Sequence, residues 1–352
     1  MKAKMLNLQD LPDEVILKIL SYQRAKELIS CGQVSTRIRK ISHDGTLWTT
    51  ANLEKKIVKT ELLEMILRKG CRILNLHNST ILGSFSFDMK SQLRVLKLSR
   101  PECDRLYHSK FDRYSPRCGC IENTDAIEDL LFSCSSLQHL EMKDVLLTTE
   151  MAEGICKNGK TLQILNLNSS DLFFKDSSFE DSSFEDSSLE DSSFEDYNYL
   201  QEIFKCCQEL KEVGLANVNY GNGITEDDDL EFLLKNIPPN VEKLNLRGTL
   251  IEDYEIETLL NRCNKIKSLS LKATWLTVDS LSNIRQCLNH TLEELSLGPF
   301  DEISDPGFLK LKSMPRLKIL KSMPRLKILK LYYKKKYYNE DEGKVIQRIL
   351  RQ

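Results

Sequence analysis

The sequence predicts an α/β protein in which a small helical module precedes a solenoid of strand–helix repeats with parallel strands. A six-residue frame with apolar residues at its first, fourth and sixth positions recurs between residues 71 and 331. The segments between the copies carry apolar residues at helical spacing, and residues 1–50 lie outside the frame. A strand–helix pair cannot bury its apolar face alone, so we expect neighbouring copies to stack.

The spacing of the frame identifies the type of repeat. Most steps between neighbouring copies are 22 to 34 residues long, close to the roughly 20–29 residues of a leucine-rich repeat. We therefore predict a horseshoe over 71–352, with parallel strands on its concave face and helices on its convex face. The copies are Cys71/Leu74/Leu76, which is the weakest, Leu93/Leu96/Leu98, Leu137/Leu140/Met142, Leu162/Leu165/Leu167, Leu210/Val213/Leu215, Val241/Leu244/Leu246, Ile266/Leu269/Leu271, Leu292/Leu295/Leu297 and Leu326/Leu329/Leu331.

Helices are expected between the frames, for example over 125–134 and 253–263, where Ile and Leu recur at helical spacing. Cys134, Cys207 and Cys263 each stand three residues before the next frame. A small residue that recurs at one point of a repeat is most simply buried at the end of its helix. Metal or redox roles are the alternative for these thiols.

Two steps, of 44 and 48 residues, indicate insertions. The first insertion is 99–124, a long excursion of mixed charge. The second is 169–197, which contains a Ser-rich acidic pentapeptide array and is predicted to be a solvated low-complexity loop. Its serines precede acidic residues at the spacing that acidophilic kinases accept, so it is either a phosphorylatable arm or an expansion without function. A nine-residue duplication at 312–320 and 321–329 lengthens the last step.

Charge is segregated along the chain. The formal net charge of −2 combines about −9 in the array at 169–197 with about +11 in 310–352. The basic end is expected to cap the last repeat or act as a weak nuclear signal rather than to bind nucleic acid. No run of 18 apolar residues and no secretory signal occur, so we expect no membrane association. The eleven cysteines are interpreted as reduced thiols of a cytoplasmic or nuclear protein.

Catalysis by this chain is not expected. The five histidines are scattered, and none lies in a common hydrolase, metalloprotease or nucleotide-binding motif. Cys103, His108, Cys118 and Cys120 could supply four zinc ligands, but their spacing matches no common paired-ligand pattern. We therefore predict no metal and no cofactor; a zinc-dependent or nucleic-acid-binding module is the alternative.

Residues 1–50 are predicted to form three short helices, joined to the repeats by a linking helix over 51–70. Pro12 stands at a predicted helix start, followed by two carboxylates and an apolar stripe that includes Val15 and Ile19. A module of this size cannot build a large core, so part of the stripe is expected to meet a partner.

Three stretches of this module carry a family resemblance. They are Leu8-x-x-Leu11-Pro12-Asp13-Glu14-Val15-Ile16-Leu17-x-Ile19-Leu20-Ser21-Tyr22, Gly32-Gln33-Val34-Ser35-x-Arg37 and Ile41-Ser42-x-Asp44-x-x-Leu47-Trp48. With the repeats behind them, the chain resembles the F-box/leucine-rich-repeat proteins over nearly its whole length. Two positions depart from the family pattern: Ile38 replaces the usual tryptophan, and Gln23 replaces an apolar residue.

The resemblance implies a function. The F-box would bind a Skp-type adaptor and, through it, the cullin scaffold of a ubiquitin ligase, and the repeats would bind a protein substrate for ubiquitination and proteasomal degradation. The adaptor-facing residues would be among Leu8, Leu11, Pro12, Val15, Ile16, Ile19, Leu20 and Leu28. A leucine-rich-repeat interaction scaffold without a ligase role is the alternative.

Substrate contacts are expected on the concave face of the C-terminal repeats. Arginine with aromatic neighbours is typical of interface hot spots. We therefore predict substrate contacts at Arg247, Lys272 and Trp275. The resemblance also implies that the substrate could be phosphorylated. Arg247 or Lys272 could then bind the phosphate.

Overall fold

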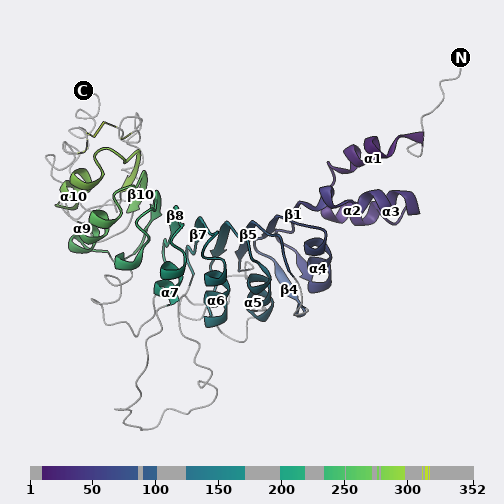
Figure 1. Ribbon diagram of the computed structural model, residues 1–352, viewed down its shortest axis with the longest axis horizontal. Helices are drawn as coiled ribbons and strands as arrows, with labels where there is room; N and C mark the ends of the chain where they lie inside the picture. The colour runs from purple at the N-terminus through teal and green to yellow at the C-terminus, as the bar shows by residue number, and fades with distance from the viewer. Residues whose placement is uncertain are drawn as a thin grey trace, which may run out of the picture. The chain divides into compact units, whose positions relative to one another are not determined.

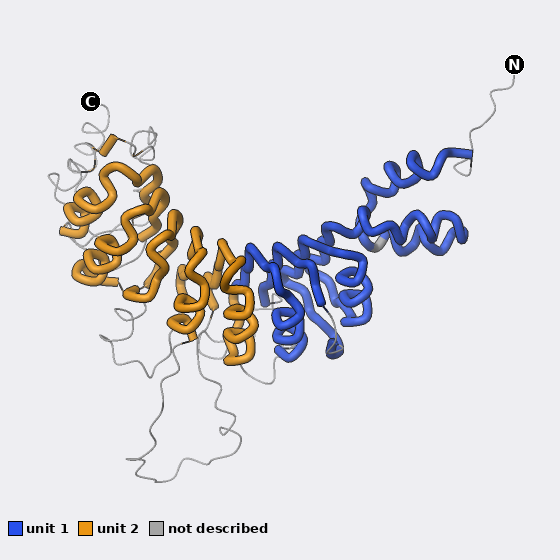
Figure 2. Tube along the Cα trace, in the orientation of Figure 1, with its two compact units in different colours: residues 1–143 blue, residues 144–352 orange. Residues whose placement is uncertain are grey.

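The computed structural model describes most of the chain in two compact units, unit 1 (residues 1–143) and unit 2 (residues 144–352) (Figure 2). The described residues are 10–85, 90–100, 124–170, 199–218, 234–249, 251–271, 276, 279–297, 311, 314, 315 and 317. Most residues of the two insertions, of the duplication and of the basic end lie outside these ranges. The ninth frame, Leu326/Leu329/Leu331, lies wholly outside them.

Unit 1 begins with the predicted helical module. Its elements are α1 (Asp13–Leu20), α2 (Ala25–Cys31), α3 (Thr36–Ser42) and the 3₁₀ helix η2 (Gly45–Trp48). Pro12 precedes α1, the Ser35 side chain accepts a hydrogen bond from the backbone N–H of Ile38, and Asp44 caps η2 in the same way. The module core contains Ile16, Leu20, Leu28, Ile38 and Ile41.

The repeats of unit 1 follow directly (Figure 1). Parallel strands β1 (Thr50–Asn52), β3 (Ile73–Leu76), β5 (Val95–Ser99) and β6 (His139–Lys143) pair in that order. A second pair, β2 (Ile57–Lys59) and β4 (Thr80–Leu82), is also parallel. Helices α4 (Thr60–Arg68) and α5 (Thr124–Ser133) lie on one side of the larger sheet.

Unit 2 continues the same architecture. Its parallel strands are β7 (Ile164–Asn166), β8 (Glu212–Gly214), β9 (Lys243–Asn245), β10 (Ser268–Leu271) and β11 (Glu294–Leu297). Its helices are α6 (Thr149–Lys157), α7 (Tyr199–Cys206), α9 (Asp253–Arg262) and α10 (Asp279–Leu288). Both units therefore have the α/β leucine-rich-repeat arrangement that the sequence predicts, and α5 and α9 match the helices expected at 125–134 and 253–263.

The register of the strands follows the sequence frame. Leu74 pairs with Leu96 and Leu96 with Leu140, so equivalent frame residues lie side by side. These leucines are fully buried. Because successive side chains of a strand alternate between its two faces, the leucines point to the helices and the residues between them to the open side.

Residues 51–70, predicted as a linking helix, contain β1 and β2 as well as α4. Ala51 pairs with Leu74 in the parallel register, and Trp48 stands three residues before Ala51 as Cys71 stands before Leu74. Trp48, Ala51 and Leu53 are all buried. They occupy the frame positions of a repeat that the leucine pattern misses, because its apolar residues are Trp and Ala.

A recurrent turn ends the strands. The residue two positions after the sixth frame residue has a positive φ in several repeats, where a left-handed conformation favours Gly, Asn and Asp. These residues are Lys55 and Asn78 in unit 1, and Asp144, Ser169, Asn217 and Gly248 in unit 2. Most of them are Asn, Asp or Gly, so the turn is encoded locally.

The recurrent cysteines have the structural place expected of them. Cys134, Cys207 and Cys263 are fully buried, each just after a helix. Burial raises the pKa of the Cys207 thiol to about 12 and that of Cys263 to about 11. A neutral thiol at these positions acts as a small apolar residue.

Candidate functional site

The first candidate surface is the outward face of α1 in unit 1. Val15, Ile19 and Tyr22 are 42%, 40% and 75% exposed, although all three are large and apolar or aromatic. Their spacing of four and three residues places them on one face of the helix and its following turn. Pro12, also exposed, extends the same row at the start of α1.

The opposite face of α1 forms the module core. Ile16 is 1% exposed and Leu20 is 5% exposed. The helix therefore has two apolar faces, of which the module buries only one. Val34, after α2, is a further exposed apolar residue at 73%.

The structure divides the predicted adaptor-binding residues into two groups. Pro12, Val15 and Ile19 are exposed and Leu11 is half-buried. Ile16, Leu20 and Leu28 are buried, where they support the surface from within; Leu8 lies outside the described residues. Adaptor contact by any of these residues stays a prediction.

The two positions that depart from the F-box pattern differ in their surroundings. Ile38 is 6% exposed and packs in the module core, so a branched aliphatic side chain fills the place where tryptophan is usual. Gln23 is exposed after α1, where a polar side chain carries no burial cost.

An ion pair fixes the start of α1 on α3. Arg37 donates from Nε to Oδ1 of Asp13 at 2.8 Å and from a terminal nitrogen to the backbone oxygen of Leu11 at 2.7 Å. Both side chains are largely exposed, so the pair contributes little stability. It joins α3 to the start of α1 at two points, the Asp13 carboxylate and the Leu11 backbone oxygen.

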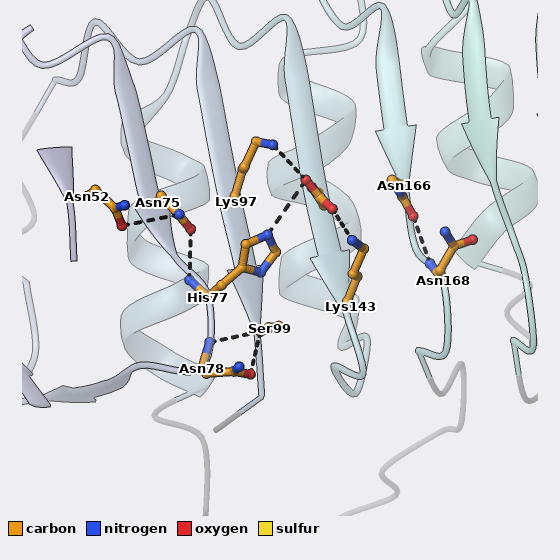
Figure 3. A network of polar contacts seen from close by, with 10 residues as sticks. Asn52, Asn75, His77, Asn78, Lys97, Ser99, Lys143, Asn166 and Asn168 are labelled. Atoms are coloured by element: carbon orange, nitrogen blue, oxygen red, sulfur yellow. Dashed lines mark hydrogen bonds and ion pairs between the residues drawn. The ribbon is translucent and has the colours of Figure 1, made fainter. Parts of the chain in front are cut away.

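The second candidate surface is the open side of the unit 1 sheet. The fifth frame position is asparagine in several repeats, where its side-chain oxygen accepts a hydrogen bond from the backbone N–H two residues later. In unit 1, Asn52 accepts from Glu54 at 3.1 Å and Asn75 from His77 at 3.0 Å. Asn75 also donates to Asn52 across the strands at 3.2 Å (Figure 3).

The next two strands carry charges at this position instead of asparagine. Lys97 of β5 and Glu141 of β6 are direct partners in the parallel register. Lys97 Nζ lies 3.1 Å from Glu141 Oε2, and Lys143 forms an ion pair with Oε1 of the same carboxylate. His77 Nε2 lies 3.7 Å from Oε2, so three side chains converge on Glu141 (Figure 3). We call these four residues the Glu141 cluster.

The electrostatics of the cluster favour an ionised Glu141. Its side chain is only 9% exposed, and burial alone would raise its pKa. The hydrogen bonds and charges of Lys143 and Lys97 outweigh burial and hold the pKa at about 2. We did not predict this cluster from the sequence. The signal was a pair of opposite charges at a frame position that carries Asn, Ser or Gly in most other copies.

The open side of unit 2 also combines asparagine hydrogen bonds with cross-strand ion pairs. Asn166 accepts a hydrogen bond from the backbone N–H of Asn168 at 3.1 Å (Figure 3). Lys243 pairs with Glu212 at 3.2 Å, and Lys267 with Glu242 at 2.6 Å.

The predicted substrate contacts fall in unit 2. Arg247 is exposed after β9, and its backbone N–H donates to Asn245 Oδ1 at 3.3 Å. Lys272 and Trp275 lie outside the described residues, and substrate contact by all three residues stays a prediction.

The described part of the chain has neither a metal-ligand cluster nor a helix suited to span a membrane. It contains no group of three or more His, Cys, Asp or Glu side chains placed to hold a metal ion. The four candidate zinc ligands at 103–120 lie outside it. Among the helices described, none is long and apolar enough to cross a membrane.

Comparison with known proteins supports the assignment of the N-terminal module. A family model described as F-box-like matches residues 8–54. The match covers α1 to η2 and strand β1, so this module is an F-box-like domain followed by repeats.

Solved structures with a partial likeness include the plant peptide hormone receptor RGFR1 in complex with RGF2, at 13% identity and a TM-score of 0.34. A protein from Bacteroides fragilis is 12% identical with a TM-score of 0.34. The matches cover 74% and 69% of this chain. They span only 36% of the receptor and 65% of the bacterial protein.

Proposed function

We propose that this chain is the substrate-recognition subunit of a Skp–cullin–F-box ubiquitin ligase. In this role the F-box-like domain binds a Skp-type adaptor, which connects the chain to a cullin, and the repeats bind a protein substrate. The observation that carries the proposal is the outward apolar row of α1 within the F-box-like match at 8–54.

The row has the properties of a partner-binding surface. An exposed Val, Ile and Tyr on one helical face would be costly for a small module unless a partner covers them in the working state. Fully covering an aliphatic side chain contributes about 1.5–3 kcal/mol. Val15 and Ile19, already partly covered, would each contribute somewhat less, so the row would supply part of the adaptor's binding energy and other contacts the rest.

The mechanism needs no catalytic group on this chain. The adaptor fixes one end of the protein to the ligase, while the repeats hold the substrate. A substrate lysine is thereby kept near the ubiquitin-charged enzyme, and the gain in rate comes from proximity and orientation. Ubiquitination would direct the substrate to the proteasome, in the cytoplasm or the nucleus.

Co-purification with a Skp-type adaptor tests the proposal. The wild-type chain and a Val15→Glu/Ile19→Glu variant are each co-expressed with the adaptor, and the complex is quantified after size exclusion. Because both residues are exposed, the variant should fold, which circular dichroism verifies, yet lose most adaptor binding. Ile57→Glu is the matched control, since Ile57 is 74% exposed and lies beyond residues 8–54.

Adaptor recovery with wild type and Ile57→Glu, but not with the double variant, would support the ligase role. If the wild-type chain recovers no adaptor, the proposal fails and an interaction scaffold without a ligase role takes its place.

A further inference from the structure

The open side of the unit 1 sheet carries an excess of positive charge. Arg72 and Arg94 are exposed at the second frame position of β3 and β5. The backbone N–H of Arg94 donates to the carbonyl of Arg72 at 2.8 Å, so the two arginines lie side by side on neighbouring strands. Lys97 and Lys143 follow further along the strands, at 35% and 44% exposure.

One carboxylate opposes these four cations on the described open side of β3, β5 and β6. The residues between the buried frame positions include a single acid, Glu141. With the histidines neutral, this surface has a formal charge of about +3. We call it the cationic face, made of Arg72, Arg94, Lys97, Glu141 and Lys143.

The charge is not a general property of the repeats. Among the described residues at the equivalent positions of β8 to β11 in unit 2, four bases face four acids, namely Lys211, Lys243, Arg247 and Lys267 against Glu212, Glu242, Glu293 and Glu294. Two cross-strand ion pairs join Lys243 to Glu212 and Lys267 to Glu242. Those charges stabilise one another within the sheet. The cations of unit 1 outnumber their partners, which favours an anion from outside.

Glu141 gives the cationic face a fixed arrangement. Its buried carboxylate holds Lys97 and Lys143 on opposite oxygens. An ammonium group has three donors, so each lysine can still donate to an incoming oxygen. Side chains that are already ordered lose less conformational entropy when a ligand binds.

We propose that the cationic face binds an acidic segment of a partner protein. This inference rests on the proposed function in one respect only, namely that the partner is the substrate of the ligase. The segment of the partner that binds would carry a run of carboxylate or phosphate side chains. The surface also carries apolar groups, since Ile73 is 39% exposed beside Arg72 and Val95 is half-buried beside Arg94.

The size of the surface favours a peptide over a nucleic acid. Three neighbouring strands span roughly 10 Å, because strands lie about 4.8 Å apart. That width matches a few side chains of one extended segment. Apolar groups between the cations suit a peptide with mixed acidic and apolar residues, whereas nucleic-acid sites combine a longer basic track with exposed aromatic side chains.

Fluorescence anisotropy with the full chain tests the inference. The probe is a labelled peptide of about 12 residues that alternates Glu and Ser, compared with its Gln and Ser counterpart and with a version carrying phosphoserine. We expect the Glu peptide to bind at low salt and the Gln peptide to bind at least tenfold more weakly. Tighter binding of the phosphoserine peptide would identify phosphate as the preferred anion, and equal binding would identify carboxylate.

Two charge-reversal variants locate the site. Arg72→Glu/Arg94→Glu should weaken binding of the Glu peptide roughly tenfold, because both residues are exposed and the reversal removes the net positive charge. Lys160→Glu/Arg262→Glu makes the same change in net charge at two exposed residues of unit 2, one in the turn after α6 and one at the end of α9. This control should bind the peptide as wild type does.

Equal binding of the Glu and Gln peptides, or an equal loss in both variants, would overturn the inference. Tighter binding of a single-stranded oligonucleotide of matched charge would do so as well. The adaptor is absent from this assay. If the chain binds the peptide but recovers no adaptor, the ligase role is wrong and the cationic face remains a binding site. If it recovers the adaptor but does not bind the peptide, the ligase role is supported and the inference about the cationic face is wrong.

Discussion

The indole Nε1 of Trp48 donates a hydrogen bond to the backbone oxygen of Ser42 at 2.8 Å in a buried environment. Ser42 is the last residue of α3, and Trp48 takes the first frame position before Ala51 in β1. Lys69, after α4, lies over the Trp48 ring at 5.4 Å. One side chain therefore contacts both the F-box-like domain, through Ser42, and the repeats, through Lys69.

Substitution of Trp48 should destabilise unit 1 more than an ordinary core change. Trp48→Ala is expected to cost about 3–5 kcal/mol through the lost packing and the cavity. Trp48→Phe keeps part of the ring but leaves the Ser42 oxygen without its donor, at about 1–2 kcal/mol. Urea unfolding followed by circular dichroism measures both. Ile57→Ala, at an exposed site, is the control and should stay within about 0.5 kcal/mol of wild type.

Acid should weaken unit 1 through Glu141. The folded protein holds the Glu141 pKa at about 2, below the ordinary value of 4.5, so the unfolded chain takes up a proton first as the pH falls. The stabilisation is therefore complete above the ordinary value and is lost between about pH 4.5 and pH 2. At neutral pH it amounts to a few kcal/mol, on the order of 2–3.

Glu141→Gln isolates this effect. The variant lacks the titrating group, so its stability deficit relative to wild type should be smaller at about pH 3.5 than at about pH 7, by roughly 1 kcal/mol. Urea titrations of both proteins at the two pH values give the free energies of unfolding. The effect of the other carboxylates is the same in both proteins, so it cancels when the deficits at the two pH values are subtracted. An equal deficit at both values would contradict the low pKa.

Thiol labelling should distinguish the adjacent residues Cys206 and Cys207 by their reactivity. Cys206 is exposed at the end of α7, whereas Cys207 is fully buried with its pKa raised to about 12 by burial. Iodoacetamide should modify Cys206 of the native protein and leave Cys207, Cys134 and Cys263 unmodified until urea is added. Fragmentation of the labelled peptide distinguishes the neighbours. Rapid native modification of Cys263 would mean that its helix end is open to solvent.

Gly159 tests the close packing of α6 and α7 in unit 2. A Cβ atom at this position would lie 2.5 Å from the carbonyl oxygen of Cys206, and backbone atoms cannot rotate away as a side chain can. Gly159→Ala should therefore destabilise unit 2 by about 1–3 kcal/mol. The adjacent exposed Lys160, changed to Ala, is the control. A neutral Gly159→Ala variant would show that α7 can move without cost.

Most of the fold could be predicted from the sequence because its determinants are local and repeated. The frame placed Leu74, Leu96 and Leu140 in the strands, and the parallel register confirms this arrangement. The same periodicity located the buried cysteines. The first strand was missed because Trp48 and Ala51 do not resemble the leucines of the frame, although their register is the same.

The sequence by itself determined the repeat register, the recurrent turns and the three short helices of the F-box-like domain, because helical and strand periodicities and turn residues act within a few positions of the chain. The tertiary structure alone decided which face of α1 is left open and which acid meets Lys97. Val15 and Ile16 are adjacent and equally apolar, and only the packing of α1 on α3 buries one and exposes the other. Lys97 and Glu141 are 44 residues apart, and only parallel pairing of β5 with β6 places their charges in contact.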